Sequence, residues 1–183
     1  LYPDNNGYYR TYTNSVFINS KVLVPFYRTE YDTIAQRIYE EALPGYEIIG
    51  IDCDNSGNNI ISASGAIHCI TKAVGIDDPL LINHAPMKSM NYGSNIQFEA
   101  SAQHRSGIES MELFYKIGGG NYSSMIMNNI QDNNYICEVT GIPANTEIEY
   151  YFKATALSGK VINRPIVAPQ GCLLYTSDAA DEK

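Results

Sequence analysis

The spacing of hydrophobic and polar residues differs between the two halves of the chain, and in the first half it predicts a mixed α/β unit. Residues 15–18 and 22–24 are apolar, β-branched runs on either side of a turn at 19–21, which is typical of a β-hairpin. Apolar residues recur at helical spacing through residues 31–42, and a Pro-Gly pair ends that pattern. Residues 46–51 form a short apolar run typical of a buried strand. One β-β-α-β unit cannot bury both faces of its sheet, so we expect it to belong to a larger repeat.

The second half of the chain predicts strands only. Short runs that alternate apolar and polar residues, or that are rich in β-branched and aromatic residues, follow one another without a helical period. Turn-forming residues, mainly Gly, Asn, Asp and Ser, separate these runs. The pattern predicts a sandwich of about seven strands, similar to an immunoglobulin-like (Ig-like) module. The predicted strands cover residues 95–102, 110–117, 122–127, 134–139 and 148–156.

These patterns divide the chain into three segments with an α+β fold class overall. We expect residues 1–84 to form the α/β part and residues 85–171 to form an Ig-like β-sandwich, with the boundary within 81–86. Residues 172–183 differ in kind, because their back-translation resembles a sequencing-library adapter read in frame. We expect this tail to be an adapter scar and not native. The chain starts at Leu and shows no signal-like segment there, so we expect it to begin within a longer gene.

Composition and charge narrow the classes of function. The formal net charge of the chain is -8, and no cluster of Lys and Arg offsets it, so we expect no nucleic-acid partner. No apolar run approaches the ~20 residues that a membrane-spanning helix needs, and we expect no membrane span. A content of 44% hydrophobic and 17% charged residues excludes a disordered chain. The acidic balance is compatible with a cationic ligand.

Cys69 is the residue best suited to carry chemistry. Gly65 and other small residues precede it, and they allow the close backbone approach and tight turn that a nucleophile facing a pocket needs. A structural cysteine buried in an apolar strand is the alternative, and the local sequence leaves it open. We do not expect His68 to be its partner, because neighbouring side chains of an extended segment point to opposite faces. We expect Cys53 to be an inert residue at a strand end.

The remaining histidines and cysteines do not predict a metal site. No His/Cys pair has the ligand spacing of a zinc site together with a second pair to complete it. His84 lies at the expected linker and His104 in the β-sandwich part, and we expect neither to have a cysteine or carboxylate constellation around it. The sequence therefore predicts no zinc site.

Four motifs, in this order and spacing, resemble the C-terminal part of bacterial agmatine deiminases and of Porphyromonas-type peptidylarginine deiminases. The string GAIHCITK at residues 65–72 is the most specific of them, far more so than a lone cysteine. The other three motifs are residues 12–15, 21–25 and 43–46. Residues 85–171 resemble the Ig-like module that follows the catalytic domain in the secreted peptidylarginine branch.

The resemblance implies a pentein fold, an α/β-propeller of five ββαβ-like units around a central active site, with residues 1–84 supplying its last part. Matched position by position, Cys69 falls on the family's catalytic nucleophile and Asn14 on its active-site Asn, which implies a substrate-binding role. A turn or capping role is the alternative for Asn14. The implied chemistry is hydrolytic deimination of a guanidino group through a Cys thiouronium intermediate, without metal or cofactor.

The resemblance also implies that essential groups are missing from this chain. The general-acid His and the paired carboxylates that bind the guanidinium belong to earlier pentein units, so we expect them upstream of residue 1. We therefore expect the 183-residue chain alone to be inactive.

Three functions stay open for the whole protein. Conversion of peptidyl-arginine to peptidyl-citrulline is favoured, because an Ig-like module follows, and it implies a secreted or cell-envelope bacterial protein acting on arginine-containing peptides or proteins. Agmatine deimination in the cytoplasm is the alternative enzyme. A catalytically dead pentein, whose Ig-like module binds an unknown partner, is the alternative from another class.

Overall fold

Two compact units make up the chain, one spanning Leu1–Gly75 and the other Ile76–Lys183. The computed structural model describes residues 9–54, 59–63, 65–85, 87, 95–143 and 145–176. Within these residues the fold is mixed α+β and dominated by sheet, with one α-helix and three sheets, so the predicted α+β class is confirmed. No helix in this part of the chain has the length and apolarity needed to cross a membrane.

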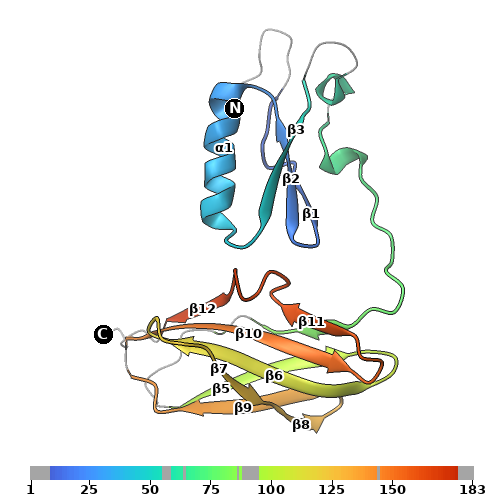
Figure 1. The fold of residues 1–183 in the computed structure, drawn as a ribbon. Helices are drawn as coiled ribbons and strands as arrows, with labels where there is room; N and C mark the ends of the chain where they lie inside the picture. The colour runs from blue at the N-terminus through green and yellow to red at the C-terminus, as the bar shows by residue number, and fades with distance from the viewer. Residues whose placement is uncertain are drawn as a thin grey trace, which may run out of the picture. The chain divides into compact units, whose positions relative to one another are not determined.

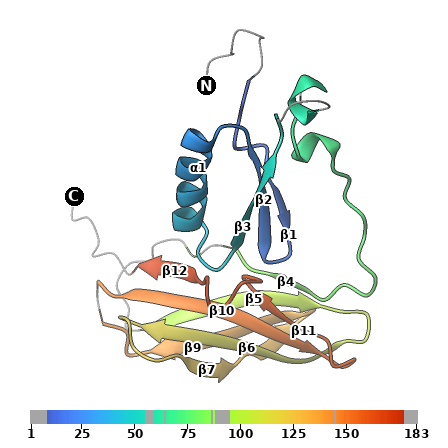
Figure 2. The same ribbon diagram turned by 45° about the horizontal axis from the view of Figure 1, so that its top comes forward.

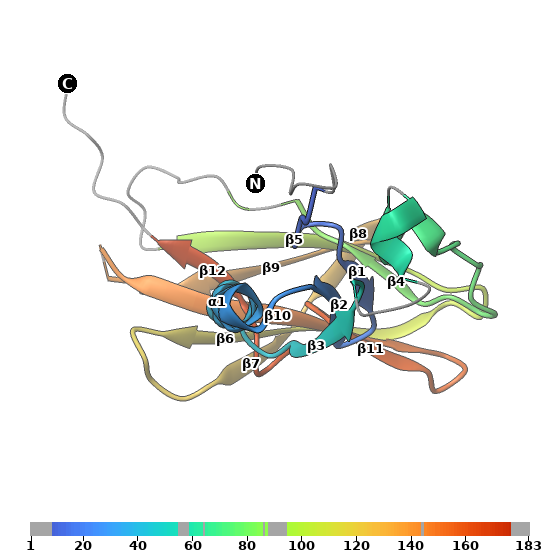
Figure 3. The same cartoon turned by 90° about the horizontal axis from the view of Figure 1, so that it is seen from above.

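The first unit contains the β-β-α-β order that the hydrophobic pattern predicts. Strands β1 (Val16–Ile18), β2 (Lys21–Phe26) and β3 (Glu47–Asp52) form a sheet in the order β1-β2-β3, and helix α1 (Thr29–Ala42) connects β2 to β3. β1 and β2 pair antiparallel through a tight turn in which Asn19 adopts a left-handed backbone, whereas β2 and β3 pair parallel. α1 lies along one face of this sheet (Figure 1), and Figure 3 shows the helix nearly end-on.

The sheet covers only part of the apolar stripe of α1. Ala35 is buried and Tyr39 is half-buried, whereas Tyr31, Ile34 and Ile38 are 58%, 48% and 54% exposed. The predicted stripe is therefore present, but its outer half faces outward. This exposed apolar surface is what we expect of one unit taken from a larger repeat.

Two short 3-10 helices, η1 (Ile60–Ala63) and η2 (His68–Ile70), follow β3. They lie on the opposite side of the sheet from α1 (Figures 1 and 3). The backbone N–H groups of Cys69, Ile70 and Thr71 each donate to the carbonyl three residues earlier; that of Cys69 reaches the Ala66 carbonyl at 3.2 Å. The extended conformation considered for this segment is therefore wrong, because these local turn bonds replace strand pairing.

The second unit is an all-β sandwich of two sheets (Figure 2). One sheet has the strand order β11-β10-β6-β7, with β12 also paired to β10, and the other has the order β4-β5-β9-β8. The strands are β4 (Leu81–Asn83), β5 (Asn95–Gln103), β6 (Ile108–Ile117), β7 (Ser123–Ile126), β8 (Asn128–Gln131), β9 (Asn134–Thr140), β10 (Glu147–Ala156), β11 (Val161–Arg164) and β12 (Leu173–Thr176). The five strands predicted from the sequence are all present, as β5, β6, β7, β9 and β10.

The core of the second unit lies between its two sheets. Along β10 every second residue from Ile148 to Ala156 is buried, and β5 shows the same alternation from Ile96 to Ala102. Phe98, Tyr150 and Phe152 are the largest of the fully buried side chains contributed by these two strands. The period of two that predicted the strands therefore also predicts which of their side chains face the core.

The division between the units falls at Gly75, nine positions before the 84/85 boundary expected from the sequence. β4 is the reason, because it pairs antiparallel with β5 and buries Leu80 and Ile82 in the sandwich core. At the other end of the chain, β12 pairs antiparallel with β10 and contributes Tyr175 to the same core. That residues 172–183 are an adapter scar stays a prediction, and residues 177–183 lie outside the described part of the chain.

Candidate active site

Cys69 lies in the middle of η2, and its thiol is exposed to solvent. Gly65 lies directly against it. A Cβ atom at position 65 would be 3.0 Å from Cys69 Cβ and 3.5 Å from Cys69 Sγ, closer than ordinary van der Waals contact allows for the first pair. A residue without a side chain at position 65 therefore permits this turn. Cys69 is neither buried nor in a strand, in contrast to the structural alternative.

Asn14 is the side chain that the structure brings to Cys69, across 55 positions of the sequence. Its Nδ2 donates a hydrogen bond to Cys69 Sγ at 3.1 Å. The other end of the amide is also engaged, because Asn14 Oδ1 accepts the backbone N–H of His68 at 2.8 Å. This second bond orients the amide with its NH₂ group toward the sulfur. The two site residues named from the sequence therefore lie in direct contact.

The surroundings of Cys69 lower the pKa of its thiol. A hydrogen bond from the Ala66 backbone is the larger cause, the hydrogen bond from the Asn14 amide is the second, and slight desolvation opposes both. The thiolate is the nucleophilic form of cysteine, and a free thiol with a pKa of about 8.5 is mostly protonated at neutral pH. The site therefore favours the reactive form.

The other three cysteines have the opposite environment. Cys53 and Cys137 are buried, and Cys172 is half-buried. Burial raises the pKa of all three thiols, that of Cys137 to about 11. Cys53, expected from the sequence to be inert, is 1% exposed directly after β3. Cys69 is thus the one exposed thiol of the four.

Two carboxylates of the first unit, Asp54 after β3 and Asp32 in α1, are engaged in structural contacts. Asp54 accepts a hydrogen bond from Arg10 Nε at 2.7 Å, lies 3.6 Å from the Arg28 guanidinium, and has a side chain only 6% exposed. Asp32, in the first turn of α1, accepts the Tyr12 hydroxyl at 2.8 Å. Neither carboxylate is free to grip a guanidinium substrate in this arrangement.

The structure corrects one expectation about the histidines. The His68 ring is exposed to solvent. His68 and Cys69 both belong to the described residues, and no hydrogen bond joins the ring to the Cys69 sulfur. His104 does have a carboxylate partner, since its Nε2 lies 3.0 Å from Asp78 Oδ1. The expectation that His104 lacks one is wrong, because the pairing of β4 with β5 brings distant residues together. Among the described residues, no group of three or more His, Cys, Asp or Glu side chains is placed to hold a metal ion.

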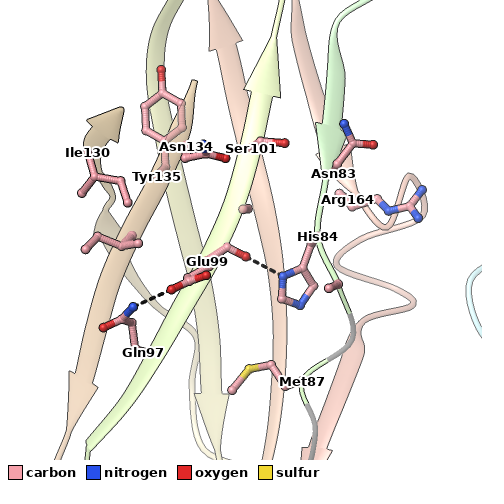
Figure 4. A pocket seen from close by; sticks show the side chains of 13 residues that line it. Asn83, His84, Met87, Gln97, Glu99, Ser101, Ile130, Asn134, Tyr135 and Arg164 are labelled. Atoms are coloured by element: carbon pink, nitrogen blue, oxygen red, sulfur yellow. Dashed lines mark hydrogen bonds between the residues drawn. The ribbon is translucent and has the colours of Figure 1, made fainter. Parts of the chain in front are cut away.

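A groove of about 1000 Å³ lies in the second unit (Figure 4). Its lining combines side-chain amides, one carboxylate and one guanidinium with apolar walls. His84 is fixed at its edge: Nδ1 donates to the Glu99 carbonyl at 2.6 Å, and Nε2 lies 2.9 Å from the Tyr150 hydroxyl. Burial lowers the pKa of His84, which favours the neutral ring. The polar side chains of the lining are Asn83, Gln97, Glu99, Ser101, Asn134 and Arg164.

The residues that hold the Asn14 loop were missed by sequence reasoning. Tyr27 and Tyr39 donate their hydroxyls to backbone carbonyls of this loop, those of Thr11 and Tyr12. Tyr39 was interpreted only as part of the apolar stripe of α1, and nothing in the local sequence indicates a partner 27 positions away.

An exposed thiol of lowered pKa, set beside a side-chain amide on a ββαβ element, is an arrangement in which a cysteine can act as a nucleophile. A match to a known family covers the same part of the chain. Residues 2–74 match the family model described as Porphyromonas-type peptidyl-arginine deiminase, so the resemblance predicted from the sequence is confirmed for this part of the chain.

A comparison with solved structures concerns the fold alone. The chain is similar to a structure titled "Crystal structure of Br derivative BhCBM56", with a TM-score of 0.37 and 11% sequence identity. The match covers 56% of this chain and 96% of that one. A likeness of this size does not define a shared ligand or activity.

Proposed function

We propose that this chain is the C-terminal part of a hydrolytic deiminase that converts peptidyl-arginine into peptidyl-citrulline and ammonia. The observation that carries the proposal is the contact between the Asn14 amide and the Cys69 sulfur, within a segment that matches a deiminase family. An exposed thiol whose pKa is lowered by two hydrogen bonds suits attack on the electron-poor carbon of a guanidinium group.

In the proposed reaction the Cys69 thiolate attacks the central guanidinium carbon and gives a tetrahedral adduct. A general acid protonates one nitrogen, the C–N bond breaks, and ammonia leaves, so that a thiouronium joins the substrate to the sulfur. A water molecule, deprotonated by the same group, then adds to the carbon, and the C–S bond breaks to release the ureido product and the thiolate. One water is consumed and one ammonia released per arginine. Asn14 stabilises the thiolate and, in this proposal, also contacts the bound guanidino group.

We propose that the first unit is the last part of a pentein domain and that the second is Ig-like. The exposed apolar stripe of α1, at Tyr31, Ile34 and Ile38, supports the first proposal, since further units would cover such a surface. In this arrangement the general-acid His and the guanidinium-binding carboxylates come from units N-terminal to this chain. A planar guanidinium is best held by paired carboxylates through bidentate hydrogen bonds, and Asp32 and Asp54 are already engaged.

The presence of the second unit bears on the proposed substrate and cellular location. A module separate from the catalytic unit favours a protein or peptide substrate over agmatine, and with it a secreted or cell-envelope location. Agmatine deimination in the cytoplasm is the alternative within the same chemistry. Both use the same nucleophile, so the substrate assay below distinguishes them.

The groove of the second unit favours one alternative of another class, a binding protein without turnover. Its single carboxylate, Glu99, accepts a hydrogen bond from Gln97 at 2.7 Å, and the lining also holds side-chain amides and the Arg164 guanidinium (Figure 4). Glu99 suits a cationic side chain of a peptide, and the amides suit the peptide backbone, through charge-assisted and amide hydrogen bonds.

The test is an assay of the full-length protein, obtained by extending the gene upstream of residue 1. Ureido product is measured from a peptide with C-terminal arginine, a peptide with internal arginine, and agmatine, each with Cys69→Ala as the matched control. We expect turnover of at least one peptide and loss of that turnover by several orders of magnitude in Cys69→Ala, because the nucleophile is removed.

The other outcomes of this assay would support other functions. Turnover of agmatine alone would assign the protein to small-molecule chemistry. Absence of product from all three substrates, in a protein shown to be folded, would contradict the enzyme. Binding of the arginine peptides that is weakened in Glu99→Gln would then support the binding protein.

A further inference from the structure

The loop that carries Asn14 is fixed by a side chain from α1. Tyr39 donates its hydroxyl to the backbone carbonyl of Tyr12 at 2.8 Å, and the same oxygen lies 3.0 Å from the Ser15 hydroxyl. One contact lies two residues before Asn14 and the other directly after it. Tyr39 therefore holds the loop on both sides of the residue that reaches Cys69.

Tyr27 provides a second fixed point for the same loop. Its hydroxyl donates to the Thr11 carbonyl at 3.1 Å, and its ring packs edge-on against that of Tyr12 with centroids 5.4 Å apart. Tyr27 is buried, and burial raises the pKa of its hydroxyl to about 12, so it remains a donor at any physiological pH. The loop is thus attached to β2 and α1 before it reaches the sulfur.

The hydrogen bond of Asn14 depends on this attachment for a geometric reason. The segment before β1 has no strand or helix of its own around Asn14, so its position comes from individual contacts: the tyrosine hydroxyls, and the His68 N–H, which also lies 3.4 Å from the Asn14 backbone carbonyl. A side-chain amide is short, and a hydrogen bond weakens steeply once distance or angle departs from the favourable range. Small movements of the loop would therefore remove the amide from the thiolate that it stabilises.

We infer that Tyr39 is a positioning residue for the nucleophile: its hydroxyl fixes the Asn14 loop so that the amide donates to the Cys69 sulfur. The inference rests on the proposed function, because it concerns the same thiolate, and it assigns a role to a residue that touches neither the sulfur nor the substrate. Tyr39 acts on Cys69 only through Asn14, and that feature makes the inference testable.

The experiment measures alkylation of Cys69 by iodoacetamide as a function of pH in the 183-residue chain, with mass spectrometry of the peptide that contains Cys69. In Tyr39→Phe, which removes only the hydroxyl, we expect the pH midpoint to rise by about half a unit and alkylation below the midpoint to slow about threefold. Tyr31→Phe is the matched control, because Tyr31 lies on the same helix and is exposed. Its midpoint should equal that of the unsubstituted chain.

A double substitution distinguishes positioning from a general loss of structure. Asn14→Ala should raise the midpoint by itself, and Tyr39→Phe should add nothing in the Asn14→Ala background, since its effect passes through the amide. Circular dichroism melts establish that each variant is folded. Ser15→Ala removes the loop's side of the contact with the Tyr39 hydroxyl and should shift the pH midpoint in the same direction. It therefore tests the inference if Tyr39→Phe proves too unstable to measure.

The outcomes separate this inference from the proposed function. If Asn14→Ala raises the midpoint while folded Tyr39→Phe leaves it unchanged, Tyr39 does not position Asn14, and the proposed function stands. An equal shift from Tyr39→Phe with and without Asn14 would also overturn the inference. If Asn14→Ala has no effect, the role of Asn14 in the proposed function fails.

Discussion

At the scale of single residues, the reactivity of Cys69 depends on how closely two other residues approach it. Asn14 supplies a hydrogen bond to the sulfur, and Gly65 leaves the space in which the turn of η2 can place the thiol beside that amide. Neither residue carries a charge. The lowered pKa of Cys69 is therefore a property of hydrogen bonding. Such an effect weakens as the distance and angle of each hydrogen bond depart from the favourable range.

Gly65→Ala tests this dependence. The added methyl group would lie 3.0 Å from Cys69 Cβ, so the thiol has to shift away from the position in which Asn14 reaches it. We expect alkylation of Cys69 by iodoacetamide to become about two- to fivefold slower at neutral pH, because a smaller fraction of the thiol is ionised.

Gly75→Ala is the control for that substitution, since a Cβ atom there meets nothing within 4 Å. Its alkylation rate should match that of the unsubstituted chain. A Gly65→Ala protein that reacts as fast would show that η2 tolerates a side chain at this position without moving the sulfur.

At the scale of secondary-structure elements, β2 and β3 show why the first unit keeps a glycine in the middle of a strand. Gly50 lies in β3, and a Cβ atom there would stand 2.2 Å from the Phe26 ring of β2. Gly50→Ala is therefore an overpacking change, and we expect it to lower the free energy of unfolding by about 1–3 kcal/mol. Urea unfolding of the 183-residue chain measures it, with Gly75→Ala expected to change it by less than ~0.5 kcal/mol. Equal midpoints for the two variants would mean that the Phe26 ring moves aside freely.

The elements that the sequence predicts are those with a local pattern. Apolar residues recur every 3.6 residues in helix α1 and every second residue in the long strands β5, β6, β9 and β10, because each of these elements presents one face to a core. The strands not predicted from the sequence are β4, β8, β11 and β12, which have only three or four residues, too few to establish a period. β1 and β7 are as short, and the turn-forming residues beside them predicted them instead. η2 was missed because its bonds are made within one turn and leave no periodic signal.

The residues of the candidate site were predicted from the sequence in a different way. No periodicity relates Asn14 to Cys69, and their pairing was expected only because motifs around both resemble one family. Tyr39 matches no such motif, and its hydroxyl serves a loop distant in sequence. Residues that position a site from another element are therefore found from the folded chain, even where the reacting residues are named beforehand.

At the scale of the whole molecule, activation of the nucleophile and turnover of a substrate are separable. Everything that lowers the pKa of Cys69 lies within the first unit, in η2 and the Asn14 loop. A deimination cycle needs more: a general acid for the departing nitrogen and carboxylates for the guanidinium, which the proposed function assigns to units outside this chain.

We therefore expect the 183-residue chain to contain a reactive Cys69 and yet to release no citrulline from an arginine peptide. Both properties are measured on one sample, with iodoacetamide kinetics for the thiol and a colorimetric ureido assay for the product, and Cys69→Ala provides the blank for each. Product above that blank would contradict the proposal that the general acid and the carboxylates lie outside this chain, because residues present here would have to supply them. A thiol no more reactive than a free cysteine would contradict the other half, since the contacts of Asn14 and Ala66 would then not favour the thiolate in solution. The two expected results together would support the proposed function, in which the first unit prepares the nucleophile and other units complete the catalytic cycle.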